Sequence, residues 1–159
     1  FTHRGMDAVL VINYTIDGIP MIFSGNEIAD DSYFSMFSSP QHGRYFVGWQ
    51  NALTDAGKRR MALLKKLSQL RSEHRAFFDG NTKWLDTSAE KDLVCFAREC
   101  ASEKFAVVVN TKNKPVSANV KIDTNGAKTL LEYGAKLECN GQNTTANLQA
   151  YGYIVVKLK

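Results

Sequence analysis

A short group of residues able to bind a polar ligand follows an apolar run near the start of the chain. The apolar run covers residues 19–23, and the group consists of Gly25, Asn26 and Glu27. A side-chain amide and a carboxylate are suited to hydrogen-bonding the hydroxyl groups of a ligand. Gly25, Asn26 and Glu27 are therefore candidate pocket residues, provided that the preceding element points them into a pocket.

The apolar run before these residues has the pattern of a buried strand. Residues 19–23 show no alternation, which is typical of a strand covered on both faces in a parallel sheet. Gly18 stands where a preceding helix would end in a left-handed residue, and Pro20 is tolerated only near the start of a strand. Ligands bind just beyond the carboxyl ends of such strands, so residues 25–27 are predicted to line a pocket. An ordinary strand-to-loop exit with solvated acidic groups is the alternative.

Helical periodicity predicts one helix on each side of this region. Residues 5–17 are apolar around most of the circumference, which predicts a buried helix. Residues 54–74 form the clearest helix, because Thr54 and Asp55 are good capping residues and leucines recur at helical spacing. A lone parallel strand needs partners on both sides, and no second segment of the chain resembles one.

The positive charge of the chain gathers on the second helix. The net charge is +4, and residues 54–75 hold seven basic residues against two acidic ones. The basic residues are Lys58, Arg59, Arg60, Lys65, Lys66, Arg71 and Arg75. Without interleaved aromatic residues or a nucleic-acid motif, we interpret them as a solvated helix face and expect no nucleic-acid partner.

The cysteines and the terminus place few limits on the cellular setting. Cys95, Cys100 and Cys139 are odd in number and lack zinc-site spacing, so we expect reduced or core thiols, with a Cys95–Cys139 disulfide as the alternative. The redox compartment is therefore open. No apolar run is long enough to span a membrane. The chain begins with neither an initiator Met nor a secretory signal pattern, and we interpret it as part of a longer protein.

A long loop rich in aromatic residues is predicted between the two helices. It covers residues 29–53 and contains Tyr33, Phe34, Phe37, His42, Tyr45, Phe46 and Trp49. Aromatic faces stack on the apolar faces of sugar rings, so the loop could line a carbohydrate pocket. Anchoring of the loop on the scaffold is the alternative for each aromatic residue. His42 is given no chemical role.

The periodicity becomes alternating after residue 83. Strands are predicted at residues 93–98, 104–110, 115–122, 129–133, 137–139 and 151–158, with a hairpin-type turn at 123–126. Short strands at this spacing predict an antiparallel sandwich of Greek-key type. Trp84 stands near the junction with the helices, where we expect a packing role.

The stretch G-I-P-M-I-F-S-G-N-E at residues 18–27 resembles the last barrel strand of the α-amylase family of glycoside hydrolases. The family form is Gly-x-Pro-x-Ile-aromatic-x-Gly-x-Glu, and Phe23 takes the aromatic place. The order of later segments strengthens the resemblance. The L-x-x-L-R pattern at residues 67–71 and the F-F-D-G turn at 77–80 resemble the final helix and its exit, and Tyr-Gly-Tyr at 151–153 resembles the family's closing strand.

The resemblance implies an α+β fragment with two domains. Residues 1–78 would be the C-terminal piece of a catalytic (β/α)8 TIM barrel, and residues 79–159 an antiparallel Greek-key β-sandwich domain. The resemblance further implies a retaining enzyme that acts on α-linked glucans such as starch or malto-oligosaccharides. Gly25, Asn26 and Glu27 would be substrate-binding residues, and Glu27 is the one that we most expect to touch substrate or orient a catalytic group.

The catalytic groups implied by the resemblance lie outside this chain. A retaining glycosidase uses a nucleophile and an acid, and the family carries them, with a stabilising Asp, on earlier barrel strands. The family's Asn-His-Asp segment is also absent, because His3 has neither Asn nor Asp beside it. Asp30 and Asp31 are adjacent on one loop, which gives no reason to expect opposed carboxyl groups. We therefore assign no catalytic residue and expect the chain alone to be inactive.

The implied partners follow from this truncation. The parent protein would bind an α-glucan, and the chain would need the missing N-terminal barrel portion. Calcium is possible in the parent, with its ligands upstream, and we expect no cofactor or metal site in this chain. An exposed half-barrel predicts self-association through residues 1–78.

Two other functions are compatible with the sequence. The chain could be a stand-alone carbohydrate-binding or interaction module without catalysis, in which the α/β half is an appendage to the sandwich. It could also come from a different α/β hydrolase, although it has no Gly-x-Ser-x-Gly elbow.

Overall fold

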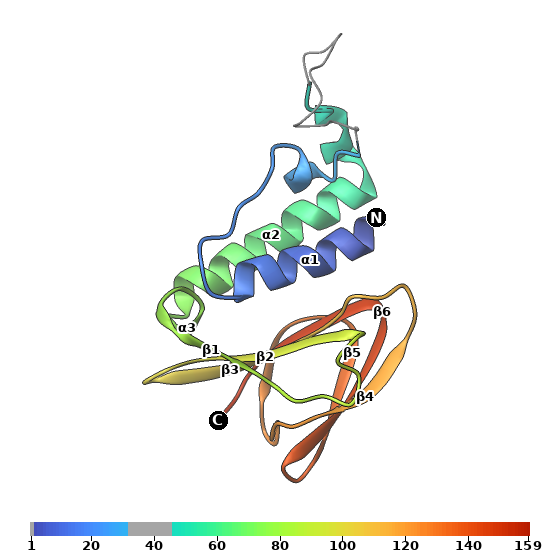
Figure 1. Ribbon diagram of the computed structural model, residues 1–159. Coiled ribbons are helices and arrows are strands. Elements are labelled where there is room, and N and C mark those ends of the chain that lie inside the picture. Colours follow the sequence, from blue (N-terminus) through green and yellow to red (C-terminus); the bar gives the residue numbers. More distant parts are fainter. Residues whose placement is uncertain (1, 32–45) are drawn as a thin grey trace. The chain divides into compact units, whose positions relative to one another are not determined.

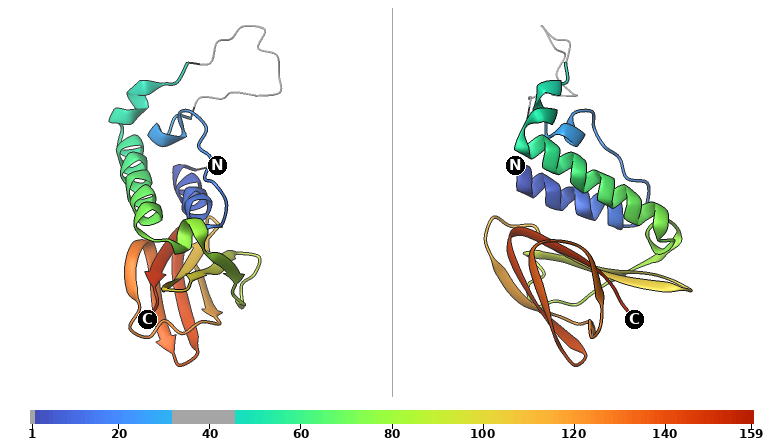
Figure 2. Two further views of the ribbon diagram at one scale, coloured as in Figure 1. Left: turned by 90° about the vertical axis from the view of Figure 1, so that its left-hand side faces the viewer. Right: turned by 180° about the vertical axis from the view of Figure 1, so that it is seen from behind.

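The computed structural model describes residues 2–31 and 46–159, which form two compact parts. One part comprises the described residues up to Pro20 together with residues 66–159, and the other comprises the described residues between 21 and 65. The helices, shown in Figures 1 and 2, are α1 (His3–Thr15), η1 (Asn26–Ile28), η2 (Trp49–Leu53), α2 (Asp55–Glu73) and α3 (Ala76–Asp79). The strands are β1 (Asn81–Trp84), β2 (Leu93–Cys100), β3 (Glu103–Asn110), β4 (Val116–Val120), β5 (Lys128–Asn140) and β6 (Asn143–Lys157).

The prediction of a buried strand at residues 19–23 is wrong for this chain. The structure assigns no regular element to these residues, and Ile19 and Met21 are 95% and 82% exposed. A parallel strand exists only when neighbouring strands accept and donate its backbone hydrogen bonds. All strands in the described part of the chain lie between Asn81 and Lys157 and pair antiparallel with one another, so none of them serves as a neighbour.

The two predicted helices are present. In α1 the Thr2 hydroxyl accepts a hydrogen bond from the Gly5 backbone N–H at 3.1 Å, which caps the first turn. In α2 the Thr54 hydroxyl accepts one from the Gly57 N–H at 3.0 Å, as its predicted capping role requires. None of the helices in residues 2–31 and 46–159 combines the length and apolar character needed to cross a membrane.

The interpretation of the α2 cations as a fully solvated face is wrong for two arginines. Lys58, Lys65 and Lys66 are exposed as expected. Arg60 is only 2% exposed, and Arg71 donates hydrogen bonds to the backbone oxygens of Tyr14 (3.2 Å), Phe77 (2.6 Å) and Gly18. Residues four positions apart share a helix face, so Arg60 lies on the same face as Leu64, and Arg71 on the same face as Leu67. The face that carries the buried residues Leu63, Leu64, Leu67 and Leu70 is called the leucine stripe below. The interpretation from charge alone therefore missed that Arg60 and Arg71 lie on the apolar face of α2.

The six strands form one curled antiparallel sheet in the order β1-β2-β3-β6-β4, with β5 also paired to β6. The C-terminal half of β6, Tyr153–Lys157, pairs with β3, whereas its N-terminal half, Thr144–Leu148, pairs with β4. β5 runs beside β6 along both halves, as Figure 1 shows. Because β6 changes its second neighbour halfway along, the sheet bends around its own core.

The strand predictions were correct for β2, β3 and β4 and incomplete for the last two strands. The segments predicted at 129–133 and 137–139 are one strand, β5, interrupted by register shifts. The turn at residues 123–126 does not close a hairpin, because β4 and β5 each pair with β6 instead of with each other. The hairpin turn lies between β5 and β6, where Gly141 has φ +70°, a conformation that favours glycine.

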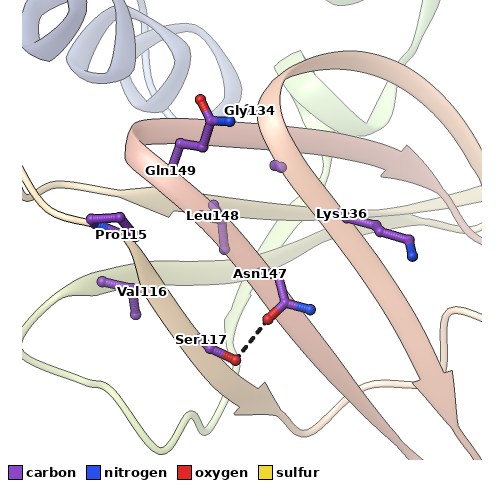
Figure 3. Close-up of a pocket in the computed structure, with 9 residues that line it drawn as sticks. Pro115, Val116, Ser117, Gly134, Lys136, Asn147, Leu148 and Gln149 are labelled. Carbon is purple, nitrogen blue, oxygen red and sulfur yellow. Dashed lines mark hydrogen bonds between the residues drawn. The ribbon is translucent and has the colours of Figure 1, made fainter.

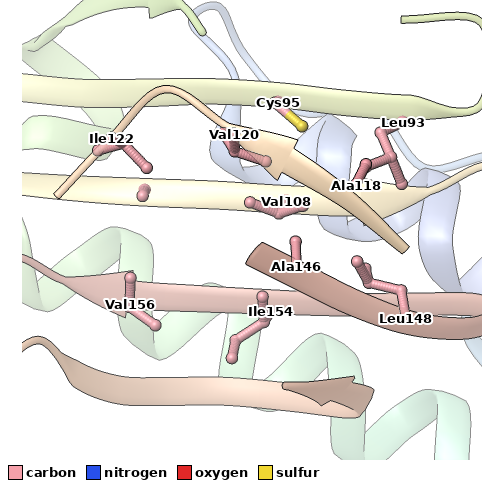
Figure 4. Close-up of a cluster of buried hydrophobic side chains, with 11 residues drawn as sticks. Leu93, Cys95, Val108, Ala118, Val120, Ile122, Ala146, Leu148, Ile154 and Val156 are labelled. Carbon is pink, nitrogen blue, oxygen red and sulfur yellow. The ribbon is translucent and has the colours of Figure 1, made fainter. Parts of the chain in front are cut away.

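Both faces of the central strands are buried. The inner face of the curl holds the cluster drawn in Figure 4, which comprises Leu93, Cys95, Ala106, Val108, Ala118, Val120, Ile122, Ala146, Leu148, Ile154 and Val156. The other face packs against α1 and α3, and there the Phe105 and Phe77 rings lie 4.6 Å apart between centroids. Residues 107–109 therefore form a continuous valine run, because the helices cover the face that water would otherwise reach.

Trp84 does not have the packed position that the sequence analysis predicted. Its side chain is 62% exposed at the end of β1, and its ring meets the buried Phe96 ring edge-on at a centroid distance of 5.7 Å. β1 is an edge strand of the sheet, since it pairs only with β2 in the described part of the chain. A side chain on an edge strand has neighbours on one side only, so proximity to the helices was not enough to bury it.

The three cysteines are free thiols, so the alternative of a Cys95–Cys139 disulfide is wrong for this structure. Burial raises the pKa of Cys95 to about 12, although a hydrogen bond with Thr87 acts in the opposite direction. We expect a thiol reagent at pH 8 to modify Cys100 and Cys139 in the folded protein, and Cys95 only after unfolding. Mass spectrometry of partially labelled protein measures this order, and equal labelling rates for all three would contradict it.

Candidate functional site

The three candidate residues form one tight turn. Gly25 has φ +98° and ψ −24°, in the left-handed region that glycine enters without a Cβ clash. Its carbonyl oxygen accepts hydrogen bonds from the N–H groups of Ile28 (3.2 Å) and Asp30 (2.9 Å). The structure therefore brings Gly25, Asn26 and Glu27 together at the start of η1, as expected from their adjacency.

The Glu27 carboxylate folds back on this turn. Its Oε2 accepts a hydrogen bond from the Gly25 N–H at 2.8 Å, and the residue is half-buried. Within the described part of the chain, Oε1 takes no hydrogen bond. A carboxylate with one oxygen fixed and one open is held in a defined orientation and can still accept a hydrogen bond from a hydroxyl group.

Asp30 has a structural role that the sequence analysis did not predict. Its Oδ2 accepts a hydrogen bond from the Gly48 N–H at 2.8 Å, and its Oδ1 accepts one from Asn51 Nδ2 at 3.2 Å. Asp30 thus ties the turn at residues 25–28 to the start of η2, which lies some 20 residues along the chain. Sequence spacing did not predict these hydrogen bonds, because Asp30, Gly48 and Asn51 are too far apart in the chain to form a local pattern.

α2 reaches the same turn through two residues. The buried Arg60 donates a hydrogen bond from Nη1 to the Asn26 carbonyl oxygen at 3.0 Å. Gly57 allows the backbone at Asn51 and Ile28 to approach α2 closely. A Cβ at this position would lie 2.0 Å from the Asn51 carbonyl oxygen and 2.8 Å from that of Ile28. Both positions continue the leucine stripe of α2 toward its N-terminus, so helical spacing is the sequence signal that could have indicated their burial, although not their partners.

The turn supplies groups for binding but not for bond cleavage. Cleavage of a glycosidic bond requires two carboxyl groups that face each other across it. The described residues of the turn offer the Glu27 carboxylate and the Asn26 amide, while the hydrogen bonds of Asp30 hold the loop together. In residues 2–31 and 46–159, no three His, Cys, Asp or Glu side chains are placed to hold a metal ion.

Most of the predicted aromatic loop lies outside the described residues. Tyr33, Phe34, Phe37, His42 and Tyr45 belong to the segment that the structure does not describe. The remaining two members, Phe46 and Trp49, are exposed. For these two, the alternative of anchoring the loop on the scaffold is therefore wrong.

Comparison with known proteins gives matches at the level of structure only. No family model and no curated protein matches the sequence. The structure is similar to the debranching enzyme from Nostoc punctiforme, with a TM-score of 0.73 at 18% identity, covering 98% of this chain and 31% of that enzyme. It is also similar to the maltogenic α-amylase AmyB from Thermotoga neapolitana, with a TM-score of 0.70 at 12% identity, covering 100% of this chain and 38% of AmyB. For the α-amylase from H. orenii the TM-score is 0.69 at 17% identity, with 99% and 36% coverage.

These matches establish the fold, and they show that the chain spans about a third of the length of each protein. The mixed α/β architecture with a curled antiparallel sheet is thus shared with enzymes of the α-amylase type.

Proposed function

We propose that the chain is the C-terminal part of a retaining, α-glucan-acting glycoside hydrolase of the α-amylase type. The observation that carries this proposal is the match to a debranching enzyme and two α-amylases over at least 98% of this chain but only 31–38% of theirs. In the proposal, residues 1–78 complete a (β/α)8 barrel, and residues 79–159 form a Greek-key sandwich. The catalytic carboxylates belong to earlier strands of the longer protein.

The exposed apolar run supports the barrel part of this proposal. Ile19 and Met21, between α1 and η1, lie almost fully in solvent. Exposure of large apolar side chains to water is unfavourable, so a pair of them this close in the sequence indicates a surface that another part of a protein covers. Parallel barrel strands on either side would cover them. Arg71, from the L-x-x-L-R pattern, bonds to the carbonyls of Tyr14 and Gly18 and so fixes the direction in which the chain leaves α1.

Glu27 has a specific part in the proposed reaction. In the proposal, the catalytic acid and the nucleophile come from outside this chain. Gly25, Asn26 and Glu27 line the wall of the substrate pocket that the complete barrel would form. The Gly25 N–H holds Glu27 Oε2, so Oε1 is oriented to accept a hydrogen bond from a sugar hydroxyl or from a catalytic group. Any calcium ion in the longer protein would be bound by residues upstream of this chain.

Activity on starch tests the proposal at two levels. We expect the 159-residue chain to release no reducing sugar from soluble starch, because two facing carboxyl groups are required. In the longer protein, Glu27→Gln should lower kcat/KM for starch by about 10- to 100-fold, the loss of one charge-assisted hydrogen bond.

Asp31→Asn is the matched control, since Asp31 is an exposed acidic residue on the same loop. It should leave kcat/KM within about twofold of the parent value. Turnover by the isolated chain would overturn the assignment of catalysis to missing strands. An unchanged rate in the Glu27→Gln protein would overturn the assigned role of Glu27.

Self-association of the isolated chain is a further expected result. The proposal leaves the apolar surface around Ile19 and Met21 without its barrel neighbours, so copies of the chain should pair through residues 1–78. Light scattering should give a mass above that of the monomer, 17.8 kDa. The double substitution Ile19→Lys and Met21→Lys should return the mass toward the monomer, whereas Trp84→Lys should not. A monomer at high concentration would argue against this surface.

A further inference from the structure

One pocket on the curled sheet, of about 640 Å³, lies where β4, β5 and β6 run side by side (Figure 3). Val116 and Leu148 are directly opposite each other there and face the core. The next pair, Ser117 and Asn147, is hydrogen-bonded at 2.7 Å and points to the other side of the sheet, because successive side chains alternate between the two faces. A single small ligand cannot contact both pairs, so we assign no ligand to this pocket.

A second pocket, of about 390 Å³, lies at the end of the core cluster to which Ile122 belongs (Figure 4). It is bounded by the end of β1, by parts of β2 and β3, and by residues 121–123, which follow β4. Its volume is within the range of about 300–1,000 Å³ that is usual for small-molecule sites, and such sites are common in the mouths of curled sheets. None of Gly25, Asn26 and Glu27 lines it, so it is separate from the candidate site described above.

The strand register places two lysines on the core-facing side of the sheet, one on each side of Ala97. Lys83 is paired with Ala97, and Ala97 with Ala106, a member of the core cluster. Lys104 precedes Ala106 by two residues on β3, so its side chain lies on the same face. The two lysines therefore flank Ala97, whose small side chain leaves space between them.

Apolar side chains on the same side line the rest of the pocket. The Leu85 N–H donates a hydrogen bond to the backbone of β2 at 3.1 Å, so Leu85 continues the pairing of β1 and β2 and lies on the core-facing side. It is half-buried and packs against the core cluster, and Ile122 is a buried member of that cluster. Trp84 borders the pocket, but its ring contacts Phe96 on the opposite face. The apolar lining thus consists of Leu85, Ala97 and Ile122.

Hydrogen bonds hold the walls of the pocket in place. The Lys121 N–H donates a hydrogen bond to the Asp86 carbonyl oxygen at 2.9 Å, which joins the segment after β4 to the segment after β1. The buried Thr144 hydroxyl donates one to the Ile122 carbonyl oxygen at 2.7 Å and is hydrogen-bonded to the Thr124 hydroxyl at 2.9 Å. Because these walls are fixed without a ligand, less conformational entropy is lost on binding.

The charged groups around the pocket favour an anionic ligand. Three lysines and two aspartates line it: Lys83, Lys104, Lys121, Asp86 and Asp123. Lys83 has no ion-pair or hydrogen-bond partner in the described part of the chain. Lys104 and Lys121 form ion pairs with carboxylates at 3.2 and 3.6 Å, but both pairs are largely exposed to solvent, and such pairs contribute little. The ammonium groups therefore remain able to bind an anion.

We propose that this pocket binds a small organic carboxylate with an apolar chain. The carboxylate lies between the ammonium groups of Lys83 and Lys104, and the chain lies on Leu85, Ala97 and Ile122. All five side chains are on the core-facing side of the sheet, so one ligand can contact them together. The ligand class follows from the lining of the pocket, and the inference does not rest on the proposed hydrolase function.

Titration of the 159-residue chain with hexanoate, acetate and 1-hexanol separates the contributions of the charge and of the apolar chain. We expect hexanoate to shift the backbone amide NMR signals of residues 83–86, 97, 104 and 121–123, with a dissociation constant of about 1 mM. Acetate lacks the apolar chain and should bind at least about tenfold more weakly. 1-Hexanol lacks the charge and should bind about fivefold more weakly.

Charge reversal at Lys83 tests the position of the carboxylate. Lys83→Glu should weaken hexanoate binding about fivefold, because a repulsion replaces an attraction. Lys112→Glu is the matched control, since it changes the net charge equally at an exposed lysine that does not line the pocket. It should leave the dissociation constant within about twofold of the parent value. The NMR spectrum of each variant also shows whether it is folded.

Four outcomes would overturn the inference. They are the absence of hexanoate-induced shifts at about 10 mM, binding of acetate as tight as that of hexanoate, binding of 1-hexanol as tight as that of hexanoate, and equal weakening by the two lysine substitutions. None of these outcomes bears on starch hydrolysis by the longer protein, which tests the proposed function separately.

Discussion

Substitution of Gly57 by alanine is expected to destabilise the part of the chain between residues 21 and 65 by about 3 kcal/mol. An alanine usually strengthens a helix relative to glycine, by about 1 kcal/mol. Here the added Cβ would lie 2.0 Å from the Asn51 carbonyl oxygen and 2.8 Å from the Ile28 carbonyl oxygen. Both are backbone atoms, so no side-chain rotation relieves the clash. The steric cost exceeds the gain in helix propensity, and the sign of the usual effect reverses.

Hydrogen exchange of the amides in the first turns of α2 measures this local effect, and urea unfolding measures the global one. Lys58→Ala is the matched control, because Lys58 is the next residue in the helix and is exposed. It should change the free energy of unfolding by less than about 0.5 kcal/mol. A Gly57→Ala protein with slower exchange than the parent would show that η1 and η2 do not approach α2 as described.

Glu103→Gln is expected to lower the free energy of unfolding by about 2 kcal/mol at pH 7. The Glu103 side chain is only 10% exposed. Its Oε1 accepts a hydrogen bond from the Ala76 N–H at 3.1 Å. Its Oε2 is hydrogen-bonded to His74 Nδ1 at 2.9 Å and to Lys157 Nζ at 3.2 Å. It therefore joins the end of α2, the start of α3 and the last strand. A neutral amide has only one acceptor oxygen, so the side chain in the Glu103→Gln protein cannot accept hydrogen bonds from both the Ala76 N–H and Lys157 Nζ, as the Glu103 carboxylate does.

The effect of Glu103 has a defined pH dependence. Burial tends to raise the pKa of Glu103, but the hydrogen bonds from Ala76, His74 and Lys157 outweigh burial, so the pKa in the folded protein lies below the ordinary value of a glutamate. Its stabilisation is thus complete above the unfolded-state pKa and is lost as the pH falls through the lower, folded-state pKa. The difference between the parent and Glu103→Gln should narrow below about pH 4.5.

Urea unfolding at a series of pH values measures this difference. Glu99→Gln provides the control, because Glu99 forms a partly exposed ion pair with Lys104 at 3.2 Å. Such pairs contribute little, and we expect a change below about 1 kcal/mol. A difference between Glu103→Gln and the parent that stays constant from pH 7 to pH 3 would contradict the role assigned to the Glu103 charge.

Features encoded by neighbouring residues were predicted from the sequence. The capping residue Thr54 and the leucine stripe specify α2 locally, and the apolar runs of β2 and β3 specify the two strands of that hairpin. The grouping of residues 25–27 into one turn followed from their adjacency and from the freedom of Gly25. For these elements the determining contacts lie within a few residues of each other.

Features that depend on distant partners were missed. Residues 19–23 have the composition of a buried strand, but hydrogen-bonding neighbours decide whether a strand forms, and the described chain contains none for them. The contacts from Asp30 to Gly48 and from Arg60 to Asn26 link residues 18 and 34 positions apart, so no local pattern revealed them. The length of β6 was underestimated because glycine and a left-handed Tyr151 interrupt its alternation.

The central place of β6 determines when the sheet can assemble during protein synthesis. β6 provides the only bridge in the described sheet between β3 and β4, yet it is translated after all the other strands. On the ribosome, the β2–β3 hairpin can form early, but β4 and β5 have no partner until residues 143–157 emerge. Their apolar side chains remain available to chaperones until then. A premature stop codon within β6 would consequently remove one strand and leave β4 and β5 without the strand that they pair with.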